Sequence, residues 1–136
     1  MTYNVGAYNS GLYNLGGGSS TISGLGDSLR RAIVSGSGSI GPKILARFTQ
    51  EPDEVLDYDV VYDQWFVGRL DTPSVAVVSV DSGIAVVDYE LRVLTKVVKI
   101  ILGYPADGVQ YKITTRLQTT SGIIKEAEFM VKGKIV

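Results

Sequence analysis

The sequence predicts an all-β fold, an antiparallel β-sandwich of about seven strands. Short runs of β-branched and aromatic residues recur through residues 50–136, and turn signals separate them at spacings of roughly 8–12 residues. No segment of this region has the apolar periodicity of a convincing amphipathic helix. With 136 residues, of which 45% are hydrophobic, the chain is long enough for one domain with a core.

The expected strands follow in order from the apolar runs. They are residues 55–62, 66–70, 75–80, 84–93, 97–102, 109–117 and 124–136. Turns are expected at 71–73, 81–83, 103–108 and 119–122, where Gly, Pro, Asp and Ser gather. Residues 109–117 have the clearest register, because Tyr111, Ile113 and Leu117 alternate with polar side chains.

The composition divides the chain into an extended N-terminal docking arm, residues 1–48, and a sandwich domain, residues 49–136. Ten of the 16 glycines and only four charged residues lie in residues 1–45. Two structures remain open near the end of the arm. Asp27 could cap a short helix through residues 29–33, or residues 30–34 and 43–49 could form strands.

The arm begins with a five-residue motif that occurs three times without a break. The copies are Tyr3-Asn4-Val5-Gly6-Ala7, Tyr8-Asn9-Ser10-Gly11-Leu12 and Tyr13-Asn14-Leu15-Gly16-Gly17. Glycine at every fifth position makes independent folding costly, whereas a tyrosine ring buries well against another surface. We therefore expect the arm to order on a partner protein, with Tyr3, Tyr8 and Tyr13 as docking residues. Arg30 and Arg31 are expected to contact that partner too.

The composition argues against several other functions. The chain has no histidine and no cysteine, and so lacks the usual general base, the commonest metal ligand and any thiol nucleophile. We expect no enzymatic activity, no cofactor and no bound metal. A net charge of −1 does not favour nucleic acid, and the apolar runs are too short to span a membrane. The amino terminus has no signal-peptide pattern, so we expect a soluble product made inside the cell.

Two features allow alternative interpretations. Six acids lie close together and could bind calcium, although a solvated, charged strand edge is the more common outcome; they are Glu51, Asp53, Glu54, Asp57, Asp59 and Asp63. Trp65, the only tryptophan, could be a platform for stacking a sugar, but a lone tryptophan beside Phe66 more often packs in a core.

Several blocks of the chain resemble a small immunoglobulin-like domain common in virion proteins of tailed bacteriophages. The matching residues are Pro52 with Glu54, Asp57-Tyr58, Trp65, Asp71-Thr72, Gly103, Gly108, Tyr111-Lys112-Ile113-Thr114, Thr119-Thr120-Ser121-Gly122 and Glu126-Ala127-Glu128-Phe129. The resemblance implies an immunoglobulin-like sandwich located in the virion and made in the host cytoplasm.

The same resemblance indicates which partners to expect. We expect a capsid decoration or cement protein that docks through its arm onto the major capsid protein or another virion subunit, and that forms a homo-oligomer. The alternatives are a tail or head–tail connector component, and an adhesion module that binds carbohydrate.

Overall fold

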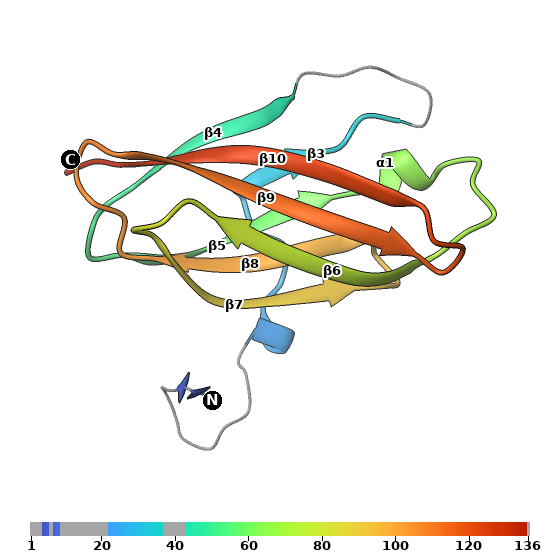
Figure 1. Cartoon of the computed structure of the whole chain (residues 1–136), viewed down its shortest axis with the longest axis horizontal. Helices are drawn as coiled ribbons and strands as arrows, with labels where there is room; N and C mark the ends of the chain where they lie inside the picture. The colour runs from blue at the N-terminus through green and yellow to red at the C-terminus, as the bar shows by residue number, and fades with distance from the viewer. Residues whose placement is uncertain (1–3, 6, 9–21, 37–42, 136) are drawn as a thin grey trace.

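Two four-stranded β-sheets pack face to face in the computed structural model, which describes residues 4–5, 7–8, 22–36 and 43–135 (Figure 1). One sheet has the order β4 (Ile44–Gln50), β10 (Ile124–Gly133), β9 (Gln110–Thr119) and β6 (Pro73–Val80). The other has the order β3 (Arg31–Ile33), β5 (Val55–Val61), β8 (Val97–Gly103) and β7 (Ala85–Arg92). The predicted β-sandwich is therefore confirmed, while its immunoglobulin-like character stays a prediction.

Four short elements complete the described chain. β1 (Asn4–Val5) and β2 (Ala7–Tyr8) pair with each other near the N-terminus. The 3-10 helix η1 (Ile22–Gly24) precedes β3, and the single-turn helix α1 (Asp63–Phe66) follows β5.

The predicted short strand at residues 66–70 is wrong, because this part of the chain holds the end of α1 and a loop. Trp65 and Phe66 are adjacent and both are buried, at 5% and 4% exposure. Successive residues of a strand point to opposite faces, but a helical turn can direct both rings inward. Gly68, with a φ of +81°, then reverses the chain after the helix.

Of the two alternatives near the end of the arm, the strands are correct and the helix is not, because residues 31–33 form β3 and residues 44–50 form β4. β3 pairs with β5 and β4 pairs with β10, and both pairs are parallel. The remaining pairs within the two four-stranded sheets are antiparallel, so the predicted antiparallel pattern holds inside each sheet and fails at one edge of each. The division of the chain at residue 48 stays a prediction, although β3 and most of β4 lie before it.

The core forms where inward-facing residues of the two sheets meet. In β9 the residues Tyr111, Ile113, Thr115 and Leu117 are all buried, which confirms the register predicted for this strand. The ring of Phe129 in β10 stacks on that of Tyr58 in β5, with centroids 5.5 Å apart. Aromatic packing between the layers therefore joins the two sheets.

A buried glutamine also connects the sheets. Gln50, at the end of β4, is 2% exposed, and its Nε2 donates hydrogen bonds to the carbonyl oxygens of Glu54 and Leu102, at 2.7 and 3.0 Å. Its Oε1 accepts a hydrogen bond of 2.7 Å from the Tyr58 hydroxyl. Burial raises the pKa of Tyr58, so this hydroxyl remains protonated and can donate. One side chain thus holds the turn after β4 and fixes β4 against β5 and β8.

Replacing this glutamine tests its contribution to the fold. We expect Gln50→Leu to lower the free energy of unfolding by about 2–3 kcal/mol, because the carbonyl groups of Leu102 and Glu54 and the buried Tyr58 hydroxyl each lose a hydrogen bond to Gln50. The measurement is equilibrium denaturation in urea. Gln110→Leu, at an exposed position of β9, is the control and should change the free energy by less than about 0.5 kcal/mol. Equal stabilities of the two variants would contradict the assigned role.

Candidate partner-docking site

The chain just before β3 lies on the outer face of the β3–β5–β8–β7 sheet, the face turned away from the other sheet. We call residues 22–30 the anchor segment. Ile22 is 2% exposed, and its carbonyl oxygen accepts a hydrogen bond from Arg92 Nη2 at 2.7 Å. Ser23 Oγ donates to Glu90 Oε1 at 2.6 Å, and the hydrogen bonds from Ser23 and Arg92 lower the pKa of Glu90. These contacts fasten the start of the anchor segment to β7.

A buried lysine lies on the same outer face. Lys99 in β8 is 0% exposed, and its Nζ is 2.7 Å from Asp59 Oδ1 and 2.9 Å from Asp57 Oδ2. Both aspartates belong to β5, where they alternate with the core residues Tyr58 and Val60 and therefore face outward. A buried ammonium is tolerated only when opposite charges surround it closely, and two carboxylates do so here.

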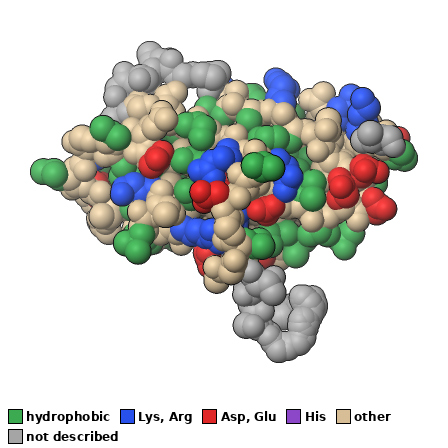
Figure 2. All heavy atoms as spheres, turned by 180° about the vertical axis from the view of Figure 1, so that it is seen from behind, with side chains coloured by type: hydrophobic (Ala, Val, Ile, Leu, Met, Phe, Trp, Pro, Cys, Tyr) green, Lys and Arg blue, Asp and Glu red, His purple; other side chains and the backbone are tan. Residues whose placement is uncertain are grey.

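The anchor segment and the start of β3 complete this ion cluster. The Ser28 backbone N–H donates to Asp59 Oδ2 at 2.9 Å, and Arg31 Nη1 lies 3.0 Å from the same oxygen. Arg30 Nη2 lies 2.8 Å from Asp57 Oδ1. Asp57 and Asp59, the counter-ions of Lys99, thus hold residues 28–31 in place. These residues in turn cover Lys99 from the solvent. Charged side chains gather across the middle of this face in Figure 2.

The charges of the cluster set the protonation of Asp57. Burial alone would raise the pKa of this carboxyl group, but the hydrogen bonds and positive charges of Lys99 and Arg30 outweigh burial, so its pKa lies below the usual value. The carboxylate therefore remains ionised at neutral pH, and the cluster keeps its alternating charges.

The predicted docking residues divide into two groups. Arg30 and Arg31 are engaged inside the molecule, although each side chain remains 31% exposed. Tyr8 ends β2, whereas Tyr3 and Tyr13 lie outside the described residues. Docking by these five residues stays a prediction. The structure shows that the chain following residue 21 is held against the sheet by the anchor segment.

Lys99 is the site residue that the sequence analysis missed. A signal was present, because this lysine interrupts the apolar run of residues 97–102. A strand that is buried on both faces has a near-continuous run of apolar residues. A single charged side chain within such a strand is buried too and needs a partner of opposite charge. The acids at positions 57 and 59 supply it, so for these two neither calcium binding nor a solvated edge is the correct interpretation.

Two further sequence hypotheses can be compared with the structure. Trp65 is buried and packs edge-to-face on Phe66 with centroids 4.9 Å apart, so it is a core residue and offers no exposed platform for a sugar. Within the described part of the chain, no group of three or more acidic residues is placed to hold a metal ion. No helix among the described residues is long and apolar enough to cross a membrane.

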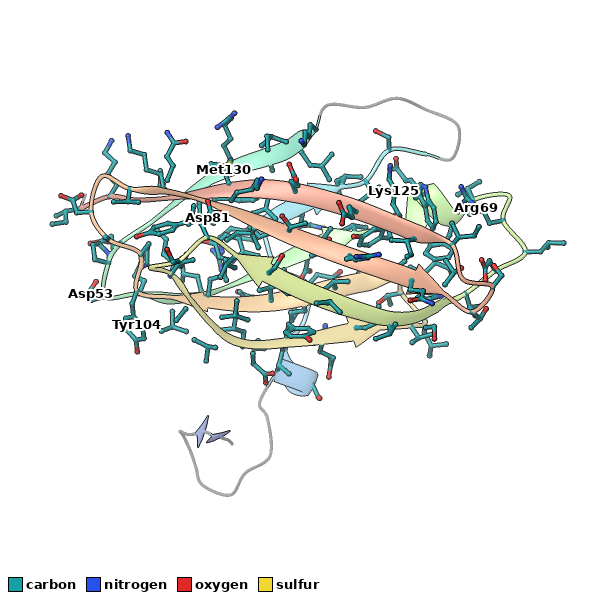
Figure 3. The ribbon with its side chains drawn as sticks, viewed as in Figure 1. Asp53, Arg69, Asp81, Tyr104, Lys125 and Met130 are labelled. Atoms are coloured by element: carbon teal, nitrogen blue, oxygen red, sulfur yellow. The ribbon has the colours of Figure 1, made fainter. Side chains whose placement is uncertain are left out.

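The end of the sandwich that contains α1 presents a second exposed surface. Leu70 is fully exposed, Leu94 is 94% exposed and Val67 is 72% exposed. We call these three residues the apolar tips. Arg69 lies at this end in Figure 3, whereas Asp53, Asp81 and Tyr104 mark the opposite end.

Hydrogen bonds hold the loop that carries two of the apolar tips. Asp71 accepts hydrogen bonds from the Thr120 hydroxyl, at 2.8 Å, and from the Ser121 hydroxyl. These bonds lower the pKa of Asp71. The Asp71-Thr72 and Thr119–Gly122 blocks, far apart in the sequence, therefore meet and fix the loop at residues 67–72.

The buried cation can be tested by a substitution of similar length. We expect Lys99→Met to lower the free energy of unfolding by about 3–5 kcal/mol, because Asp57 and Asp59 then lose a shared counter-ion in a buried site. Lys112→Met removes a lysine that is 45% exposed and 3.9 Å from Glu128, and it should cost less than about 1 kcal/mol. Denaturant unfolding of both variants provides the comparison, and a small loss in Lys99→Met would contradict the role of the cluster.

The cluster also predicts how stability depends on pH. The folded-state pKa of Asp57 lies below the unfolded value of about 3.9, so its contribution is complete above that value and is lost as the pH falls through the folded pKa. Asp57→Asn should therefore show a shallower decline in unfolding free energy below about pH 4 than the unaltered protein. Asp53→Asn, which removes a carboxyl group at an exposed turn position outside the cluster, is the control. Identical slopes in Asp57→Asn and the unaltered protein would refute the assignment.

The chain was compared with curated proteins and with solved structures. No curated protein matches the chain. Among solved structures, the cysteine protease inhibitor EhICP2 from Entamoeba histolytica is similar over 79% of this chain and 100% of its own, with 7% identity and a TM-score of 0.45. This likeness is too low to support any conclusion.

A family model described as "Podophage GP4 fiber-tail adaptor protein gp77" matches residues 50–132, more than half of the chain. The match includes the blocks between Pro52 and Phe129 that resemble phage virion proteins. It supports a structural protein of a bacteriophage virion. It does not support the expected capsid decoration role and agrees better with the tail alternative. The chain therefore belongs to the podophage GP4 fiber-tail adaptor family, gp77.

Proposed function

We propose that this protein is a tail component that joins a fibre to the phage tail. An adaptor of this kind must hold two different proteins at once, and it therefore needs two docking elements on separate parts of its surface. The family description supports a place between fibre and tail. The described residues include two features suited to such a task.

The first feature is the attachment of the N-terminal arm, and this observation carries the proposal. Residues 1–21 contain no charged side chain and three tyrosines, a composition suited to docking. The position at which this segment joins the sandwich is fixed, because Ile22 is buried against the sheet and Ser28 is hydrogen bonded to Asp59. A partner bound to this segment is then connected to a fixed point on the sandwich.

The second feature is the set of apolar tips at the α1 end. Val67, Leu70 and Leu94 expose large apolar groups to water, and burial of such groups is worth about 1.5–3 kcal/mol each. Hydrogen bonds of Asp71 fix the loop that carries Val67 and Leu70, which lowers the entropy cost of docking. We infer that this end contacts the second partner.

Particles produced without this protein provide the test. We expect complete heads and tails without fibres, and recovery of fibres when purified protein is added. Quantitative mass spectrometry should find about a dozen copies per particle, as expected for a ring around the tail, and not the hundreds of a shell-wide protein.

Recovery by variants then separates the docking elements. Leu70→Ser with Leu94→Ser should restore fibres poorly while the unfolding free energy remains unchanged, because both side chains are exposed. Val87→Ser, at a position of β7 that is 52% exposed, is the matched control and should restore fibres fully. Normal fibres on particles that lack the protein would disprove the adaptor function.

A further inference from the structure

β6 is an open strand edge. It lies last in the order β4–β10–β9–β6, so β9 pairs with one side of it and no strand of the described chain pairs with the other. Its eight residues, Pro73–Val80, include no charged side chain. Val75 and Val77 are 48% and 53% exposed. In Figure 1 the strand runs along the margin of the front sheet.

The other sheet edges are better protected against an added strand. β7 carries Asp88, Glu90 and Arg92, has a bulge between Val86 and Asp88, and lies against η1. β3 has only three residues, and β4 includes an exposed arginine, Arg47. Proteins commonly protect edges with charges, bulges or short strands, because an open edge offers unpaired N–H and C=O groups to another chain. β6 has a proline and a register shift at its start, between Pro73 and Val75, and it contacts β7. Its other residues form a long edge without any charged side chain.

The N-terminal segment of the chain has the properties of a strand that could fill this edge. Residues 1–21 are uncharged, as β6 is, and β1 and β2 are extended. One tyrosine of such a strand would pair well with the exposed valines of β6, since aromatic and β-branched side chains stabilise each other across strands. Neighbouring tyrosines are five residues apart, so the next one would point to the opposite face. Twenty-one residues span up to about 70 Å, whereas a strand along β6 needs about 27 Å.

We propose that the open edge of β6 accepts the N-terminal segment of a second copy of this chain as an added strand. Each copy then offers one arm and one edge. Such an exchange is heterologous, so it links successive copies head to tail and closes into a ring when the rotation permits. A strand along β6 uses about eight of the 21 residues of the segment, so the rest of the segment can still bind another virion subunit. The exchange concerns contacts between identical copies and does not depend on the adaptor function.

Two full-length variants test the exchange. Val77→Lys adds a charge at the open edge, and Tyr8→Pro places a residue in the arm that cannot donate a ladder hydrogen bond. Val87→Lys is the matched control, since Val77 and Val87 are 53% and 52% exposed and lie on the edge strands of different sheets. Urea denaturation of all three establishes that each remains folded.

The readout is molar mass as a function of concentration, by sedimentation. The unaltered protein and Val87→Lys should associate, whereas Val77→Lys and Tyr8→Pro should each remain monomeric. An equimolar mixture of the last two should form a one-to-one dimer, because one intact arm and one intact edge remain. Three outcomes would overturn the proposal. They are an unaltered protein that remains monomeric, as it would if each arm bound its own β6, association of Tyr8→Pro by itself, and a mixture of the two variants that remains monomeric. None of these measurements uses tails or fibres, so failure here is distinct from failure of the adaptor function.

Discussion

The need to neutralise one buried ammonium group governs much of the second sheet. Lys99 is inaccessible to water, and an isolated charge there would cost several kcal/mol. Asp57 and Asp59 must therefore face it across the β5–β8 pair, which fixes the register of these strands. The same carboxylates have further lone pairs to satisfy, and Ser28, Arg30 and Arg31 satisfy them. The path of the chain before β3 thus follows from a requirement for charge balance.

A similar constraint acts between the sheets. Gln50 satisfies all of its polar atoms with groups from β5, β8 and the turn after β4, and Tyr62 and Thr115 share a second buried hydrogen bond between layers. Apolar packing accepts many arrangements of two sheets, whereas a buried polar group is satisfied in only one. These two contacts therefore make the relative position of the sheets specific, and the aromatic core supplies most of the burial.

The sequence predicted those features that depend on local pattern. The alternation of β9 and the turn residues at 119–122 indicated a strand and a hairpin that the structure contains. The helix α1 was missed because residues 66–70 were interpreted as a strand, and only the joint burial of Trp65 and Phe66 distinguishes a helical turn. The parallel pairing of β3 and β4 was missed because partners distant in the chain leave no periodic signal.

The candidate site was predictable only in part. The repeated Tyr-Asn motif indicated an arm, and Arg30-Arg31 was noticed as a charged pair. Sequence spacing gave no indication that these arginines face Asp57 and Asp59, since 27 or 28 residues separate the partners. The structure thus adds internal partners for Arg30 and Arg31, while their docking onto another protein stays a prediction.

The parallel pairing of β3 with β5 has a mechanical consequence. A pull on the N-terminus reaches the sandwich through the anchor segment and then loads β3 along its length. The hydrogen bonds between these strands lie across that direction, so they resist in shear and must break together, along with the ion pairs of Asp57 and Asp59. Attachment at this strand would therefore withstand tension better than attachment at a hairpin, whose bonds open one at a time.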